Sequence, residues 1–167
     1  MPHKRQDAFY LEAQINKPLE GKSWDVTIIG PGGPDDLIEH GGNEYIRSQN
    51  DRIYSCTGLK ESTPQWEGIK VYDNHLTDEE FEDRGGMRSP AQEWLGTIVE
   101  PRWEAAKRSL CGIFRVVDTK LAEKLKNAWE QGVLHTIGLS MDTLPIDRET
   151  MIEGKRIPVI EGFKQII

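Results

Sequence analysis

Residues 118–143 read DTKLAEKLKNAWEQGVLHTIGLSMDT, a helical pattern followed by a strand pattern. Asp118 or Thr119 can cap a helix that extends to Gln131, and Gly132 is a typical helix-terminating residue. The apolar residues of this helix recur at helical spacing, and they predict a buried face made of Leu121, Leu125, Ala128 and Trp129. The apolar stretch 133–143 then predicts a strand that carries Ser140.

Most of the remaining apolar segments have strand character. Alternating or β-branched residues predict strands in DAFYLEAQIN (7–16), WDVTIIG (24–30), IKVYDNHL (69–76), WLGTIVEP (94–101), CGIFRVVD (111–118) and RIPVIEGFKQII (156–167). Short helices are expected in 77–83 and 100–110, a loop in 85–90, and a long irregular connection with one strand inside it in 35–68. Many strands with a few short helices predict an α+β or mainly β, barrel-like domain.

Composition excludes several classes of function. The length of 167 residues suits one soluble domain, and no apolar run approaches the ~20 residues that a membrane span needs. The N-terminal residues are not those of a signal peptide, so the two cysteines should be reduced. A net charge of −7 disfavours a nucleic-acid partner. Because the chain stops inside an apolar strand, we expect it to be truncated at its C-terminus.

The sequence contains no clear motif for binding a nucleotide or a metal ion. The loop GPGGP (30–34) lacks the long helix of a dinucleotide fingerprint and the lysine of a P-loop, so it is interpreted as a turn. The histidines have no partner four residues away and the cysteines are far apart, so we expect no metal and no cofactor. Cys111 has apolar neighbours and should be an inert buried thiol, whereas Cys56 lies in a turn-rich stretch and should be more exposed.

Ser140 and His75 are the remaining candidates for chemistry. A serine nucleophile needs a base to accept its proton, and an imidazole performs this role near neutral pH. His75 follows a predicted strand, where a side chain can face a groove from a rigid support, and Ser140 lies beside Gly138. Taken one at a time, a histidine at a strand end and a serine within a strand are more often structural than catalytic.

The order of these segments resembles that of the prohead (capsid maturation) proteases of tailed bacteriophages, serine peptidases related in fold to the herpesvirus assemblins. The resemblance extends from about residue 24 to the end of the chain. It rests on an ordered set of motifs: EGIKVYDNHL, RGGMRSPAQEW, LGTIVEPRW, LCGIFRVVD, LAEKLKNAWEQG and HTIGLSMD. Each motif is short, and the set, with histidine before serine and a helix between them, is far more specific than its parts.

The resemblance implies catalytic roles for individual residues. His75 matches the catalytic histidine of the family, and Ser140 matches its nucleophile. Herpesvirus relatives use a second histidine after the serine, whereas the resemblance to the phage members implies an acidic residue in this role. No histidine follows Ser140 in this chain. Glu161 is therefore the first choice for the third residue, with Asp147 second and Asp142 third.

The resemblance also implies a fold and a biological role. We expect residues 1–167 to form a single protease domain, α+β and mainly β, with an assemblin-like, partly open β-barrel and a few surrounding helices. Its substrates would be the phage scaffold, the major capsid protein and the protease itself, inside the immature prohead in the host bacterial cytoplasm. Self-association is a further expectation. Two alternatives stay open: a catalytically inactive scaffold or capsid-assembly module with the same fold, and a small binding module that uses the GPGGP loop.

Overall fold

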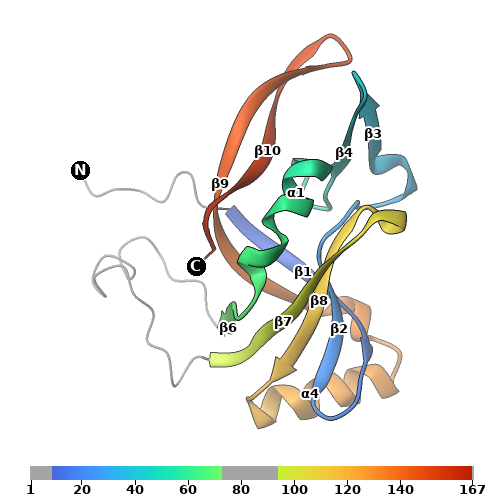
Figure 1. The fold of residues 1–167 in the computed structure, drawn as a ribbon. Coiled ribbons are helices and arrows are strands. Elements are labelled where there is room, and N and C mark those ends of the chain that lie inside the picture. Colours follow the sequence, from blue (N-terminus) through green and yellow to red (C-terminus); the bar gives the residue numbers. More distant parts are fainter. Residues whose placement is uncertain (1–8, 73–93, 167) are drawn as a thin grey trace, which may run out of the picture.

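The computed structural model describes residues 9–72 and 94–166. Ten strands of this part form one sheet, in the order β3-β4-β5-β10-β9-β1-β2-β8-β7-β6 (Figure 1). The strands are β1 Phe9–Pro18, β2 Ser23–Ile29, β3 Leu37–His40, β4 Asn43–Arg47, β5 Ile53–Ser55, β6 Lys70–Tyr72, β7 Trp94–Glu104, β8 Ser109–Val116, β9 Gly138–Ile152 and β10 Lys155–Ile166. The described helices are α1 Cys56–Ser62 and α4 Thr119–Glu130, with 3-10 turns η1 Pro34–Asp36, η2 Thr63–Trp66, η3 Ala105–Lys107 and η4 Leu134–Thr136.

Six strands, β9-β1-β2-β8-β7-β6, curl into a nearly closed barrel. Each neighbouring pair in this series is antiparallel, and the last strand, β6, lies against the first, β9. Side chains alternate between the two faces of a strand, so every second residue points into the barrel. The resulting core is apolar and includes Ile15, Val26, Ile98, Phe114 and Leu139.

The other strands extend the sheet from the second half of β9. β9 pairs with β1 as far as Thr143, and from Thr143 onward it pairs with β10. β10 pairs in parallel with β5, and the β3–β4 hairpin continues the sheet from there. Helix α1 packs directly on the backbone of β10, because a Cβ atom at Gly58 would lie 2.1 Å from the carbonyl oxygen of Glu161. Only glycine permits this approach.

The predicted fold class is confirmed: the chain is mainly β, with a barrel-like sheet and two described helices. Helix α4 begins where the sequence predicts, since the Asp118 carboxylate accepts a hydrogen bond of 2.9 Å from the Leu121 N–H. It ends before Gly132, whose φ of 73° is the left-handed conformation typical of a residue that follows a helix.

Two connections differ from the prediction. The sequence predicts a helix-like segment in 100–110, but β7 continues to Glu104 and returns through η3 into β8. A register shift between Val99 and Arg102, where Glu100 has φ 50°, lets the strand resume with Arg102 opposite Cys111. Pairing in the sheet here outweighs the helix propensity of the EAAK segment.

The predicted irregular connection 35–68 contains three strands and helix α1 instead of one strand. The apolar stretch RIYSCTG divides between β5 and α1, because the Ser55 hydroxyl caps the helix by accepting a 3.1 Å hydrogen bond from the Gly58 N–H. Cys56, at this junction, is 7% exposed, so the expectation that it is more exposed is wrong.

The buried face of α4 is narrower than the sequence predicts. Leu125 and Ala128 are buried and Leu121 is half-buried, but Trp129 is 46% exposed. The helix contacts β1, β8 and η4 along the stripe centred on Leu125, and Trp129 lies at the edge of this stripe. The expectation of a fully buried Trp129 is therefore wrong.

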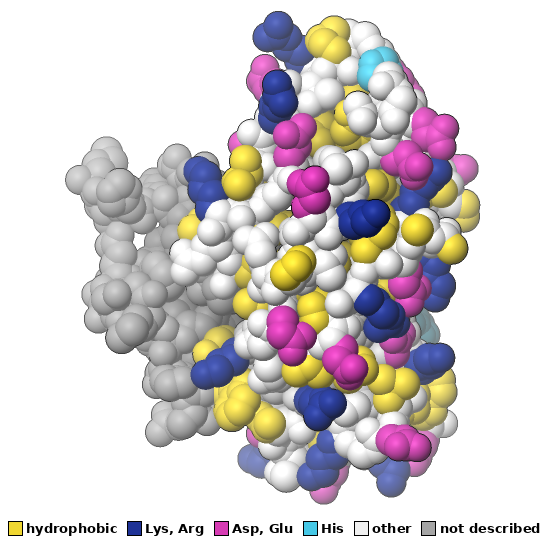
Figure 2. Space-filling model, viewed as in Figure 1, with side chains coloured by type: hydrophobic (Ala, Val, Ile, Leu, Met, Phe, Trp, Pro, Cys, Tyr) yellow, Lys and Arg dark blue, Asp and Glu magenta, His cyan; other side chains and the backbone are white. Residues whose placement is uncertain are grey.

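The visible surface carries charges of both signs. Acidic and basic side chains are interspersed over the face shown in Figure 2, without a large area of one sign. Within residues 9–72 and 94–166, no helix is both long and apolar enough to cross a membrane.

We expect Leu125→Ala to lower the free energy of unfolding by about 2–5 kcal/mol, because it leaves a cavity under α4. Trp129→Ala should cost about 1 kcal/mol, since its side chain is already half in water. Urea unfolding followed by circular dichroism measures both values. Equal losses for the two variants would contradict this description of the helix face.

Candidate functional site

Strand β9 carries the predicted nucleophile position. In the antiparallel pairing of β9 with β1, Ser140 lies opposite Glu12 and Gly138 lies opposite Gln14. Leu139 and Met141 are buried in the core of the barrel. Because a strand alternates, positions 140 and 142 belong to the outer face of the sheet.

The predicted base follows a strand that lies against β9. β6 ends at Tyr72, three residues before His75, and Val71 anchors it in the core at 1% exposure. β6 and β9 are in contact although 68 positions separate Tyr72 from Ser140. His75 itself lies outside the described residues, as do the predicted helix 77–83 and the loop 85–90.

Glu161, the first choice for the third catalytic residue, lies exposed on β10. The sequence predicts that it shares a face with Val159 and Phe163, which are both buried, but a bulge between Ile160 and Gly162 interrupts the alternation there. The prediction of a shared face is therefore wrong, and its catalytic role stays a prediction. Asp147, the second choice, is also exposed.

Asp142, the third choice, is the one of the three candidate acids that is buried. It is 1% exposed and belongs to the same face of β9 as position 140, two residues away. A buried carboxylate is costly unless it is paired, and Asp142 does take part in a polar interaction. Burial and position thus distinguish Asp142 from the other two acids.

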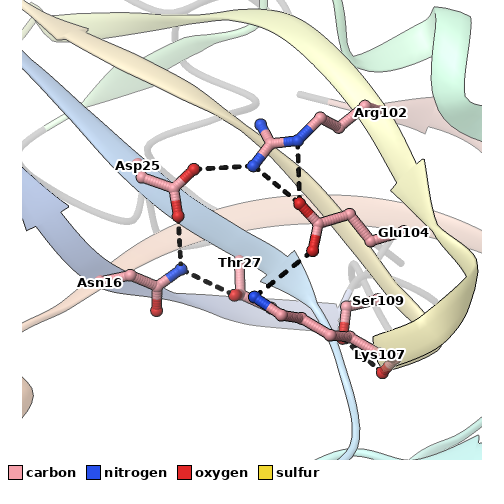
Figure 3. A network of polar contacts seen from close by, with 7 residues as sticks. All are labelled: Asn16, Asp25, Thr27, Arg102, Glu104, Lys107 and Ser109. Carbon is pink, nitrogen blue, oxygen red and sulfur yellow. Dashed lines mark hydrogen bonds and ion pairs between the residues drawn. The ribbon is translucent and has the colours of Figure 1, made fainter. Parts of the chain in front are cut away.

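A polar network lies on the same outer face of the barrel, over β1, β2 and β7 (Figure 3). The Arg102 guanidinium donates to Asp25 Oδ1 at 2.7 Å and to Glu104 Oε1 at 3.0 Å. The Asn16 amide donates to Asp25 Oδ2 at 3.1 Å and to Thr27 Oγ1 at 2.9 Å. Asp25 therefore has a partner on each carboxylate oxygen.

The network continues toward the β7–β8 turn. Lys107 Nζ lies 3.5 Å from Glu104 Oε2, and Ser109 donates to the Lys107 carbonyl at 2.9 Å. The network is connected to β9 by a row of residues that are paired from strand to strand. From β9 to β7, this row consists of Gly138, Gln14, Thr27, Cys111 and Arg102. Cross-strand partners share a face, so the network and position 140 lie on one surface of the sheet.

The sequence pattern does not predict this network. Arg102 and Glu104 fall in the segment predicted as helical, so they are not expected to face β2. Alternation within the predicted strands could have shown part of it, because polar Asn16, Asp25 and Thr27 alternate with apolar neighbours.

Two opposing effects act on the carboxyl group of Asp25. Burial alone raises its pKa, but hydrogen bonds from Arg102 and Asn16, together with the positive charge of Arg102, hold the pKa below its ordinary value of 3.8. A carboxyl group with a depressed folded-state pKa stabilises the protein above its unfolded pKa. That contribution is lost as the pH falls through the folded-state value.

The thiols give no sign of reactivity. Cys56 and Cys111 are both free and buried. Burial raises the pKa of Cys56 to about 11, and it also raises the pKa of Cys111. A protonated, buried thiol is a poor nucleophile. In the described ranges, no three histidine, cysteine, aspartate or glutamate side chains are grouped as a metal site would require.

We expect the free energy of unfolding to fall as the pH is lowered from 6 to 3, and to fall less in Asp25→Asn than in the wild type. The amide cannot take up the proton that weakens the contact with Arg102. Urea titrations at both pH values give the two differences. An identical pH dependence in both proteins would mean that Asp25 contributes nothing to it.

No protein-family model and no curated protein sequence matches the chain. Among solved structures, the chain is similar to the bacteriophage T4 capsid assembly protease gp21, at 15% sequence identity and a TM-score of 0.49. The alignment covers 95% of this chain and 92% of the T4 chain.

Proposed function

We propose that this protein is a serine endopeptidase of phage prohead maturation, with Ser140 as nucleophile and His75 as base. The ordered motifs of the sequence carry this proposal. One observation supports it: the strand that leads to His75 lies against the strand that carries Ser140. These two strands are far apart in the sequence and in contact in the fold.

The proposed reaction is acyl transfer to serine followed by hydrolysis. His75 accepts the proton of Ser140 as its Oγ attacks the peptide carbonyl, and then gives that proton to the leaving amine. The same imidazole next takes a proton from water as the water oxygen attacks the acyl-enzyme, and it returns this proton to Ser140 Oγ as the ester bond breaks and the carboxylic acid product leaves. Backbone N–H groups near Ser140, or a donor from another strand, stabilise the oxyanion.

An acidic third residue would orient the imidazole and stabilise its charged form. The sequence favours Glu161 for this role, and the burial of Asp142 makes it an alternative candidate. An exposed carboxylate is screened by water, whereas a buried one interacts strongly with a nearby cation. We therefore expect Asp142 to matter more than Glu161.

The proposed substrates are segments of the phage scaffold and major capsid protein, and the protease itself. The site of action would be the immature prohead in the host bacterial cytoplasm, and self-association of the protease is part of the proposal. Neither a nucleic acid nor a membrane enters it. The alternative is that the protein is a catalytically inactive assembly module with the same fold. A substitution of Ser140 distinguishes the two functions, because only a serine peptidase would lose activity.

We expect Ser140→Ala to abolish cleavage of scaffold protein co-expressed with the enzyme, with a rate loss of several orders of magnitude and an unchanged melting temperature. Ser23→Ala, in another strand, is the matched control and should cleave normally. Gel electrophoresis and mass spectrometry of the products give the result. Near-normal cleavage by Ser140→Ala would refute the nucleophile, and a wild type with no activity would favour the inactive module.

Single amide substitutions at the three acids identify the third residue. We expect Asp142→Asn to lower kcat by orders of magnitude with little change in KM, and Asp147→Asn to have little effect. If Glu161 orients the imidazole, Glu161→Gln will show the loss instead. Melting temperatures control for unfolding of the buried variant. Normal kcat in all three variants would leave a serine–histidine dyad.

A further inference from the structure

A pocket of about 320 Å³ lies next to the barrel face that carries position 140. Gln14 and Thr27 form its side on the sheet, Gly30 and Pro31 of the GPGGP loop form one wall, and the turn 48–50 forms the other. The pocket is thus lined in part by the GPGGP loop. This loop has no role in the fold or in the proposed reaction as described above.

The two walls are tied together. The Gly32 N–H donates to the Arg47 carbonyl at 2.9 Å, and the Arg47 guanidinium lies 3.9 Å from Asp36 and 3.4 Å from Asp51. A Cβ atom at Gly32 would lie 3.3 Å from the backbone nitrogen of Gln49, so glycine allows the loop to approach the turn closely. A pocket whose walls are already linked needs little ordering when a ligand binds.

The pocket offers neutral hydrogen-bonding groups. The side chains of Gln14 and Gln49 are exposed, and neither amide forms a hydrogen bond in the part of the chain that the structure describes. Thr27 already has polar partners, because its oxygen accepts from Asn16 and its hydroxyl interacts with the Cys111 thiol, so the two glutamines are the groups that can serve a ligand. Among the described residues, no charged side chain lines the pocket. Such a set suits an amide or a hydroxyl group better than an ion.

The pocket lies a short distance from the proposed scissile bond. Gln14 is the diagonal neighbour of Ser140, since Ser140 pairs with Glu12, two residues earlier on β1. Diagonal neighbours in a sheet are about 7–8 Å apart. An extended peptide advances about 3.3 Å per residue, so a bound peptide would reach from position 140 to the pocket in two or three residues.

We infer that this pocket is a specificity subsite for the substrate peptide, and that it binds an Asn, Gln, Ser or Thr side chain two or three residues from the scissile bond. The inference rests on the proposed function. Gln14 and Gln49 exchange hydrogen bonds with the substrate side chain, and Gly30 and Pro31 of the GPGGP loop form one wall beside it.

The test is cleavage of a peptide library derived from a bacterial proteome, with the cleavage sites mapped by mass spectrometry. The wild type should enrich Asn, Gln, Ser and Thr at one position two or three residues from the cut. The double variant Gln14→Ala/Gln49→Ala should lose that enrichment alone, and KM for one enriched peptide should rise roughly tenfold with kcat unchanged. Gln131→Ala, an exposed glutamine after α4, is the matched control.

Gln14→Glu supplies a second measurement that a folding defect cannot mimic, because the added charge should shift the preference at the same position toward Lys and Arg. A profile unchanged in both the double variant and Gln14→Glu would overturn the subsite while leaving the proposed function intact. Absence of Ser140-dependent cleavage by the wild type would overturn the proposed function, and the subsite with it.

Discussion

Strand β9 is buried on both of its faces at residues 141–143, and much of the molecule depends on this. On one face, Leu139 and Met141 enter the core of the barrel. On the other face, Asp142 is buried as well. At Thr143 the strand changes partner, because this residue pairs with Phe9 of β1 on one side and with Ile166 of β10 on the other. The same strand therefore closes the barrel and begins the extension that follows it.

This arrangement gives the two faces of the barrel wall different roles. The inner face holds the apolar core, where substitutions change stability. The outer face carries the row of cross-strand partners from Gly138 to Arg102, with the pocket at Gln14 and position 140 close to one end of it. If the proposed site forms on this outer face, the packed core behind it would hold the reacting groups in place without a separate support.

Arg102 shows how such a surface is stabilised. Its guanidinium is shared by Asp25 and Glu104, and each contact satisfies a carboxylate that is partly shielded from water. Partly buried ion pairs stabilise a protein only when the geometry is good and the remaining oxygens are satisfied. Asn16 meets this condition for Asp25, and Lys107 does so for Glu104. The network joins β1, β2 and β7 across the outside of the barrel.

The sequence alone determined much of the local structure. Alternation in segments such as 24–30 and 111–118 is enough to predict strands, and the capped pattern 118–132 is enough to predict α4, because these signals depend on near neighbours. The resemblance carried by the ordered motifs also pointed to Ser140 and His75, and the lack of a histidine after Ser140 led to three candidate acids. Tertiary structure decided which of those acids is buried, since a bulge at Glu161 and the two-sided cover of β9 involve contacts between distant segments. It also decided that 100–110 is a strand and a turn: Arg102 lies opposite Cys111 only when β8 is beside it, and no local pattern contains that partner.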